Sequence, residues 1–122
     1  MDRKTIMSIL KELKTTLDIT DHIRLELRPM KTKAASISLK WKTIRINKFL
    51  TSNLDEEAMK YLILHELAHL KLNTTHHTNE LYNLIYAIID KNDVEKFETE
   101  ILAKLIELSN KRNKRIINRI TF

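Results

Sequence analysis

Apolar positions in the first part of the chain change from a helical spacing to strict alternation. Residues 3–17 carry apolar side chains three or four positions apart, which predicts an amphipathic helix. Residues 22–29 then alternate between apolar and charged side chains until Pro29, which predicts a half-buried strand. A second alternating run covers residues 34–47, and we expect Lys42-Thr43 to form the turn of a hairpin there. Its apolar face before the turn carries Ala35, Ile37, Leu39 and Trp41.

The second part of the chain returns to helical spacing. We expect a helix from Leu54 to about Leu72, capped by Asn53 with Glu56 three residues later as in a capping box. A second helix should run from about His77 to Ile89, and a third should begin near Val94. The pattern therefore predicts an α+β fold with an N-terminal helix, a small three-stranded sheet, a long apolar helix and two or more C-terminal helices.

Composition limits the class of protein and the kinds of site. With 122 residues, 43% hydrophobic and 31% charged, the chain fits one globular domain over residues 1–122. The absence of cysteine excludes disulfides and thiolate metal sites, so a transition metal would need His, Asp or Glu ligands. The N-terminus lacks the pattern of a signal peptide, and no apolar run is long enough to cross a membrane. We therefore expect a cytoplasmic protein without a membrane partner.

Positive charge is concentrated in a basic C-terminal tail, about residues 110–122. The net charge is +6, and five positive charges fall between Lys111 and Arg119 with no acidic residue in the tail. Such a tail is either the solvated end of a helix, a segment that packs on the protein or on a partner chain, or a nucleic-acid contact. Only Phe122 is aromatic there, so stacking on bases is not supported, and we do not expect a nucleic-acid partner.

The sequence His65-Glu66-Leu67-Ala68-His69 places three ionisable groups inside the most apolar predicted helix. Each residue of a helix turns by ~100°, so His65 and His69 lie about 40° apart, one turn from each other. Both imidazoles can reach one metal ion, and Glu66 lies beside it, where a carboxylate can act on metal-activated water. The apolar neighbours would bury these groups, and zinc would compensate the cost of burying them. The alternative is a pair of histidines hydrogen-bonded to carboxylates without a metal.

A catalytic zinc site usually has three protein ligands, so the pattern calls for a third. The residues NTT should break the helix and return the chain toward His69, where His76 and His77 follow. We favour His77, because it opens the next apolar-periodic helix, and Glu80 one turn later could orient it. His76 is an alternative ligand, and so is a glutamate of the third helix, Glu95 or Glu98.

The stretch ILHELAHL, preceded by a small sheet, resembles the zincin metallopeptidases, in particular the selecase and minigluzincin group of minimal archaeal forms. The segment HELAHLKLNTTHHTNELY is also similar to the SprT-like small metallopeptidases. In those proteins HExxH is followed by a His, then Ser, Thr or Gly, then an aromatic or apolar pair. The resemblance implies His65, His69 and His77 as ligands and Glu66 as general base, whereas the gluzincin pattern implies Glu95 or Glu98 as third ligand. The metzincin pattern requires a glycine, and this chain has none.

The motif and the resemblance together predict a zinc-dependent endopeptidase acting on peptides or unfolded proteins. An exposed strand at residues 34–40 could bind the substrate backbone as an added strand. Tyr61, Tyr82 and Tyr86 are candidates to stabilise an oxyanion. The competing hypotheses are a non-catalytic nucleic-acid or protein binding module with a structural metal site, and a latent, self-associating peptidase.

Overall fold

A computed structural model describes residues 1–112 of the chain. The basic tail predicted at about 110–122 therefore lies largely outside the described residues, and its role stays a prediction. Within residues 1–112, no helix is long and apolar enough to cross a membrane. The assignment of residues 1–122 to one domain also stays a prediction.

A three-stranded sheet forms one layer of the fold. Strands β1 (Arg24–Arg28), β2 (Ala35–Ser38) and β3 (Thr43–Asn47) are arranged in the order β1-β3-β2. β1 runs parallel to β3, with Leu25 opposite Ile44, and β2 runs antiparallel to β3, with Ile37 opposite Ile44. β2 is therefore an edge strand, and one side of its backbone is not paired within the sheet.

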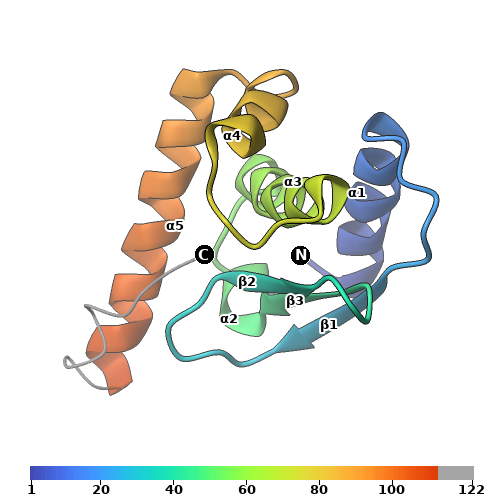
Figure 1. Ribbon diagram of the computed structural model, residues 1–122. Helices are drawn as coiled ribbons and strands as arrows, with labels where there is room; N and C mark the ends of the chain where they lie inside the picture. Colours follow the sequence, from blue (N-terminus) through green and yellow to red (C-terminus); the bar gives the residue numbers. More distant parts are fainter. Residues whose placement is uncertain (113–122) are drawn as a thin grey trace.

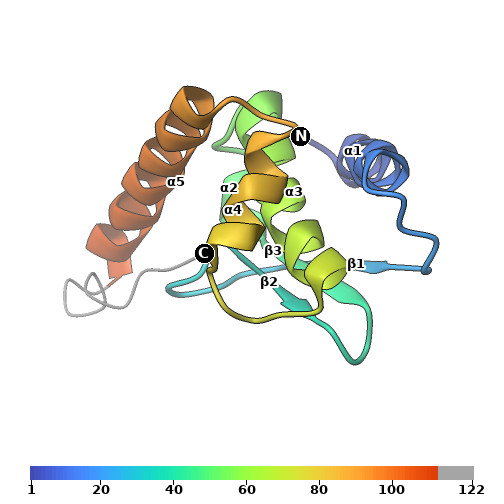
Figure 2. The same cartoon turned by 45° about the horizontal axis from the view of Figure 1, so that its top comes forward.

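The helices form the second layer, with α3 (Glu56–Leu72) at its centre. Figures 1 and 2 show α3 lying over the sheet between α1 (Arg3–Thr16) and α5 (Lys91–Arg112), with α4 (Asn79–Tyr86) against it on the side away from the sheet. All positions from Tyr61 to Leu70 are buried. A helix that is apolar all round is stable only when covered on every side, and these neighbours cover it. The predicted α+β fold is confirmed.

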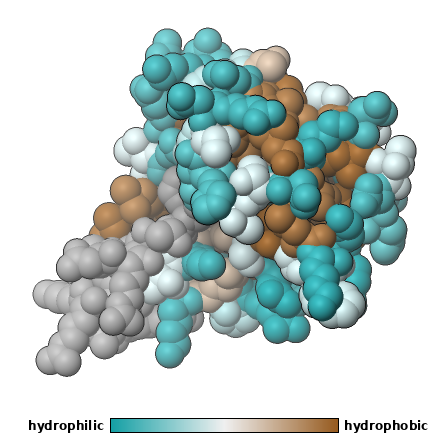
Figure 3. Space-filling model, viewed as in Figure 1, coloured by the Kyte–Doolittle hydropathy of each residue, from teal (hydrophilic) through white to brown (hydrophobic). Residues whose placement is uncertain are grey.

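Hydrophobic residues also reach part of the surface. In the view of Figure 1, hydrophobic residues reach the surface near the middle of the molecule, and hydrophilic residues surround them (Figure 3). Among the described residues, Trp41 and Leu102 are the large hydrophobic side chains that are exposed, at 69% and 41%.

The hairpin turn was predicted too late in the chain. The turn occupies residues 39–42, Lys42 has a left-handed φ of 49°, and Thr43 already belongs to β3. Trp41 is therefore a turn residue and not a core residue of a strand. The alternating pattern continues through the turn, so periodicity could not locate it.

The start of α3 also differs from the prediction. The N-cap is Asp55, whose carboxylate accepts a hydrogen bond from the Ala58 backbone N–H at 2.8 Å, and not Asn53. Asn53 instead follows a short helix α2 (Lys48–Thr51), which was not predicted. Its Nδ2 donates to the carbonyl of Phe49 in that helix. Both Asn and Asp cap helices well, so the residue type alone did not distinguish them.

The second predicted helix begins two residues later than expected. Thr78 is the N-cap of α4 and accepts from the Leu81 N–H at 3.2 Å, so His77 lies in the loop before the helix. The prediction that His77 opens the helix was wrong. The third helix begins earlier than predicted, at Lys91.

Candidate metal centre

Helix α3 carries the HExxH motif into the interior. His65 is 1% exposed, Glu66 4% and His69 6%. Three such groups are costly to bury unless other groups satisfy their polar atoms. The sequence places them at this depth because the remaining residues around them on α3 are apolar and pack against the sheet and the other helices.

A tight turn after α3 brings the next segment back to the motif. Asn73 takes the left-handed conformation, with φ of 50°, and the Thr74 N–H bonds to the His69 carbonyl at 3.0 Å. Glycine usually occupies such a position, and asparagine tolerates it best among the residues with a side chain. In a chain without glycine, Asn73 therefore makes the reversal that returns His77 to the site.

His65, His69 and His77 form a compact triangle. Their ring centroids are 5.0 to 5.1 Å apart in each of the three pairs. One ligand atom from each lies within 4.8 Å of the others, and the Nε2 atoms of His65 and His77 are 3.1 Å apart. His77 is exposed, whereas the other two are buried. The structure thus brings together the two motif histidines and the favoured third one.

Hydrogen bonds orient the two buried imidazoles. The carbonyl of Thr74 can only accept, so His69 donates from Nδ1 to it at 2.8 Å and its Nε2 carries the lone pair. His65 has its Nδ1 3.2 Å from the Tyr61 hydroxyl, on the side away from His77. In both rings, the nitrogen that remains points toward the centre of the triangle.

Burial keeps these imidazoles neutral. Desolvation, with a smaller contribution from the neighbouring histidines, lowers the pKa of His65 to about 3. Desolvation also lowers the pKa of His69, against the opposing effect of the Thr74 hydrogen bond. Neutral imidazole is the form that binds a metal, so both side chains are in the ligand form at neutral pH.

The triangle fits a tetrahedral metal with nitrogen ligands. Two imidazole nitrogens bound to zinc at ~2.1 Å with a tetrahedral angle are about 3.4 Å apart. The 3.1 Å separation of the His65 and His77 Nε2 atoms is close to this value. Three histidines with no thiolate are a donor set used by catalytic zinc, which keeps a fourth position open.

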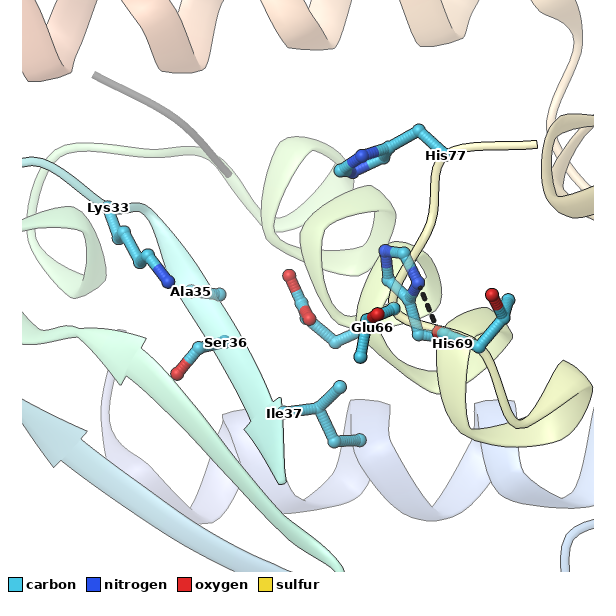
Figure 4. Close-up of a pocket in the computed structure, with 9 residues that line it drawn as sticks. Lys33, Ala35, Ser36, Ile37, Glu66, His69 and His77 are labelled. Atoms are coloured by element: carbon cyan, nitrogen blue, oxygen red, sulfur yellow. Dashed lines mark hydrogen bonds between the residues drawn. The ribbon is translucent and has the colours of Figure 1, made fainter. Parts of the chain in front are cut away.

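Glu66 lies beside the histidines and has no metal-ligand role in this geometry. Its side chain lies between α3 and β2 in Figure 4, with Lys33, Ser36 and Ile37 across the cleft. Burial raises the pKa of Glu66 to about 7, although the positive charge of Lys33 lowers it. A carboxyl group with this pKa can both take up and release a proton near neutral pH.

A cleft of about 330 Å³ runs past Glu66, His69 and His77. One wall is the edge strand β2, through Ala35, Ser36 and Ile37, and the other is the loop at Thr74 and Thr75. The unpaired side of an edge strand next to a site can bind an extended peptide.

The other predicted ligands lie elsewhere. His76 is exposed and its N–H bonds to the Thr74 hydroxyl, while Glu80 and Glu95 are exposed. Within residues 1–112, Glu80 makes no hydrogen bond with His77, so the structure gives it no orienting role. Glu98 accepts from the Tyr61 hydroxyl at 2.6 Å and does not join the three histidines.

The tyrosines predicted as oxyanion stabilisers are not equivalent. Tyr61 is fully buried behind His65, and its pKa is raised far above its ordinary value by burial and by Glu98. The Tyr82 hydroxyl also donates to Glu98, at 3.5 Å, and the Tyr86 ring lies tilted beside the Tyr82 ring, with 5.8 Å between centroids. Sequence reasoning missed the link between Tyr61 and Glu98, although a tyrosine one turn before His65 was a signal that it could reach this ring. It also missed Lys33, for which no sequence signal existed.

Comparison with known proteins identifies a family of metallopeptidases. Residues 3–114 match the model of the YgjP-like metallopeptidase domain. The chain is 40% identical over 105 residues to an uncharacterised protein of Methanocaldococcus jannaschii, MJ0123, covering 86% of this chain and 96% of that protein. An uncharacterised protein of Aquifex aeolicus is 40% identical over 74 residues, which cover 61% of this chain and 67% of that protein.

Two solved structures have the same fold. The metallopeptidase zymogen jannalysin of Methanocaldococcus jannaschii superposes with a TM-score of 0.76 at 40% identity, over 83% of this chain and 97% of that one. The metallopeptidase zymogen abylysin of Pyrococcus abyssi gives a TM-score of 0.76 at 30% identity, over 82% and 94% of the two chains.

Proposed function

Because this chain belongs to the YgjP-like metallopeptidase family, we propose that it is an endopeptidase that holds zinc with His65, His69 and His77. The predictions of a minimal zincin metallopeptidase and of an enzyme are confirmed by the family match and by the two related structures. The observation that carries the finer proposal is the triangle of three imidazoles beside a buried glutamate.

The three histidines have different parts in holding the metal. His65 and His69 are fixed by α3 and by hydrogen bonds at their Nδ1 atoms, so they form the rigid half of the site. His77 comes from the exposed loop and completes the set. Zinc held by these three imidazoles would supply Lewis-acid chemistry at this place.

Glu66 is the general base of the proposed reaction. Its carboxylate takes a proton from the attacking water and passes it to the amine nitrogen of the leaving half of the substrate. The raised pKa of about 7 supports both steps, because the group gains and loses a proton without a large free-energy cost at neutral pH. A structural metal site has no need of such an unligated carboxylate.

The substrate is a peptide or an unfolded protein segment in extended form. β2 offers its free edge beside Glu66, so main-chain hydrogen bonds can align the peptide across the cleft. Main-chain recognition requires an extended segment and would exclude a folded substrate from a cleft of about 330 Å³.

The test compares the parent protein with Glu66→Ala, purified in parallel and assayed on an unfolded protein substrate. The proposal expects hydrolysis to be lost while the bound zinc per chain stays the same. Parent protein that binds no zinc, or a Glu66→Ala variant that digests substrate at the parental rate, would contradict it. The non-catalytic binding module predicts a different result, in which the parent and the variant both bind zinc and neither digests the substrate.

We also propose that the same enzyme has a latent resting form, which is inactive until the cleft is opened. Both related solved structures are metallopeptidase zymogens, which supports the latent part of the hypothesis of a latent, self-associating peptidase. Removing the residues beyond Asn110, or diluting the protein, should then raise the specific activity. Equal activity before and after both treatments would exclude latency from this source.

A further inference from the structure

A chain of polar groups extends from the buried His65 away from the cleft, through the buried Tyr61, to the half-buried Glu98 of helix α5. His65 Nδ1 lies 3.2 Å from the Tyr61 hydroxyl, and that hydroxyl lies 2.6 Å from Glu98 Oε2. Tyr82 adds a second, longer contact to the same carboxylate oxygen at 3.5 Å. The proposed metal reaction uses none of these groups, so they require a separate explanation.

The direction of the hydrogen bonds follows from the donor inventory. A tyrosine has one proton to donate, and a carboxylate can only accept. The 2.6 Å contact is in the range of a charge-assisted O–H···O⁻ bond, so the Tyr61 hydroxyl donates its hydrogen bond to Glu98. The phenolic oxygen is then left to accept, and the partner that can donate to it is Nδ1–H of His65.

We infer that Tyr61 and Glu98 are positioning residues that fix His65 as the Nδ1–H tautomer and so present its Nε2 lone pair to the metal. This role goes beyond the proposed function but rests on the same three-histidine site. It places Glu98 two hydrogen bonds away from the ligand His65 instead of among the ligands. Partners that hold the second nitrogen of a metal-bound histidine also raise its basicity as a ligand.

The geometry of the rings supports a fixed orientation. Tyr61 is fully buried, stacks on Phe97 at 6.2 Å between centroids, and meets His65 edge to face at 5.9 Å. The phenol therefore has little freedom to turn its hydroxyl elsewhere. Glu98 comes from α5 and His65 from α3. The hydrogen-bond relay from Glu98 through Tyr61 to His65 therefore makes the orientation of this ligand depend on how the two helices pack.

The test uses the metal-free protein first, where activity plays no part. Long-range ¹⁵N–¹H correlation spectra of ¹⁵N-histidine-labelled protein distinguish the two neutral tautomers of His65. The parent should show Nδ1–H, whereas Tyr61→Phe, which removes only the hydroxyl, should lose this preference. Tyr86→Phe is the matched control, since Tyr86 belongs to the same aromatic cluster but has no hydrogen bond to His65 or Glu98 within residues 1–112.

Zinc affinity gives the second readout, from competition between the protein and a chromogenic chelator. The dissociation constant for zinc should rise about 10- to 100-fold in Tyr61→Phe and remain parental in Tyr86→Phe. Glu98→Gln keeps an acceptor oxygen but removes the charge, so it should keep the tautomer and give a smaller rise. Glu95→Gln, on the exposed side of α5, should change neither quantity.

Three results would overturn the inference: a parental His65 with the proton on Nε2, an unchanged tautomer in Tyr61→Phe, or unchanged zinc affinity in that variant. If Tyr61→Phe does not fold, Glu98→Leu is used for the same two measurements, with the same expectation as for Tyr61→Phe. A parent protein with the Nδ1–H tautomer but no zinc binding would contradict the proposed function and leave the hydrogen-bond relay intact.

Discussion

Ionisation of the buried Glu66 should destabilise the metal-free protein as the pH rises, and replacing it with glutamine should remove this effect. Burial raises the pKa of Glu66 from its ordinary value of 4.5 to about 7, with Lys33 acting in the opposite direction. The folded state therefore binds this proton more tightly than the unfolded chain. Its contribution to stability is fully present below pH 4.5 and is lost as the pH rises through about 7.

The size of the effect follows from the two pKa values. A difference of one pKa unit corresponds to ~1.4 kcal/mol, so the interval from 4.5 to about 7 corresponds to about 3 kcal/mol in the free energy of unfolding. Between pH 5 and pH 8, about 2.5 kcal/mol of this should be lost. Glutamine cannot ionise, so Glu66→Gln should gain about this much relative to the parent over that range.

The assay is urea denaturation followed by circular dichroism, in the presence of a chelator, at pH 5 and pH 8. The measured quantity is the difference in unfolding free energy between Glu66→Gln and the parent at each pH. His65 has a pKa of about 3 in the folded protein, so it destabilises both proteins as the pH falls below its ordinary value of 6.5. This contribution cancels in the difference, because both proteins contain His65.

Glu95→Gln is the control, because it makes the same change of side chain at an exposed position of α5. A difference between Glu66→Gln and the parent that stays constant from pH 5 to pH 8 would refute the reasoning. It would mean that Glu66 has an ordinary pKa despite its burial, and that water or a nearby cation solvates the carboxylate.

Three further changes test the rest of the site. Asn73→Val should destabilise the protein by about 1–2 kcal/mol in a denaturation experiment, because a β-branched residue resists the left-handed φ of 50°. Asn73→Gly should be tolerated. Equal losses of stability in both variants would contradict the argument. Lys33→Met should raise the pKa of Glu66 above about 7 in an NMR titration of the metal-free protein, whereas exposed Lys31→Met should leave it unchanged. Chelation should abolish peptidase activity and zinc should restore it, and free zinc at ~100 times its dissociation constant should stabilise the folded state by about 2.7 kcal/mol; an activity that survives chelation excludes a metal mechanism.

The sequence by itself determined what depends on local geometry. The spacing of His65 and His69 places both on one face of any helix, and the apolar residues around them require that helix to be buried. The absence of glycine left residues with side chains to take the left-handed conformation, and Asn73 does so at the end of α3. The order of the strands and of the longer helices followed from periodicity for the same reason, because each such pattern is contained in one stretch of chain; the four-residue α2 was too short to be predicted this way.

Tertiary structure decided which distant residues meet at the motif. His76 and His77 are neighbours in the sequence, and only the path of the Asn73 turn brings His77 to the other two histidines. Glu98 was an alternative third ligand from sequence, and the packing of α5 places it behind His65, at the Tyr61 hydroxyl, instead. The order β1-β3-β2, which leaves β2 at the edge beside Glu66, likewise depends on strand pairing between distant segments. Hydrophobic patterns specify that such segments are buried, but not against which partner, because burial of apolar surface is non-directional.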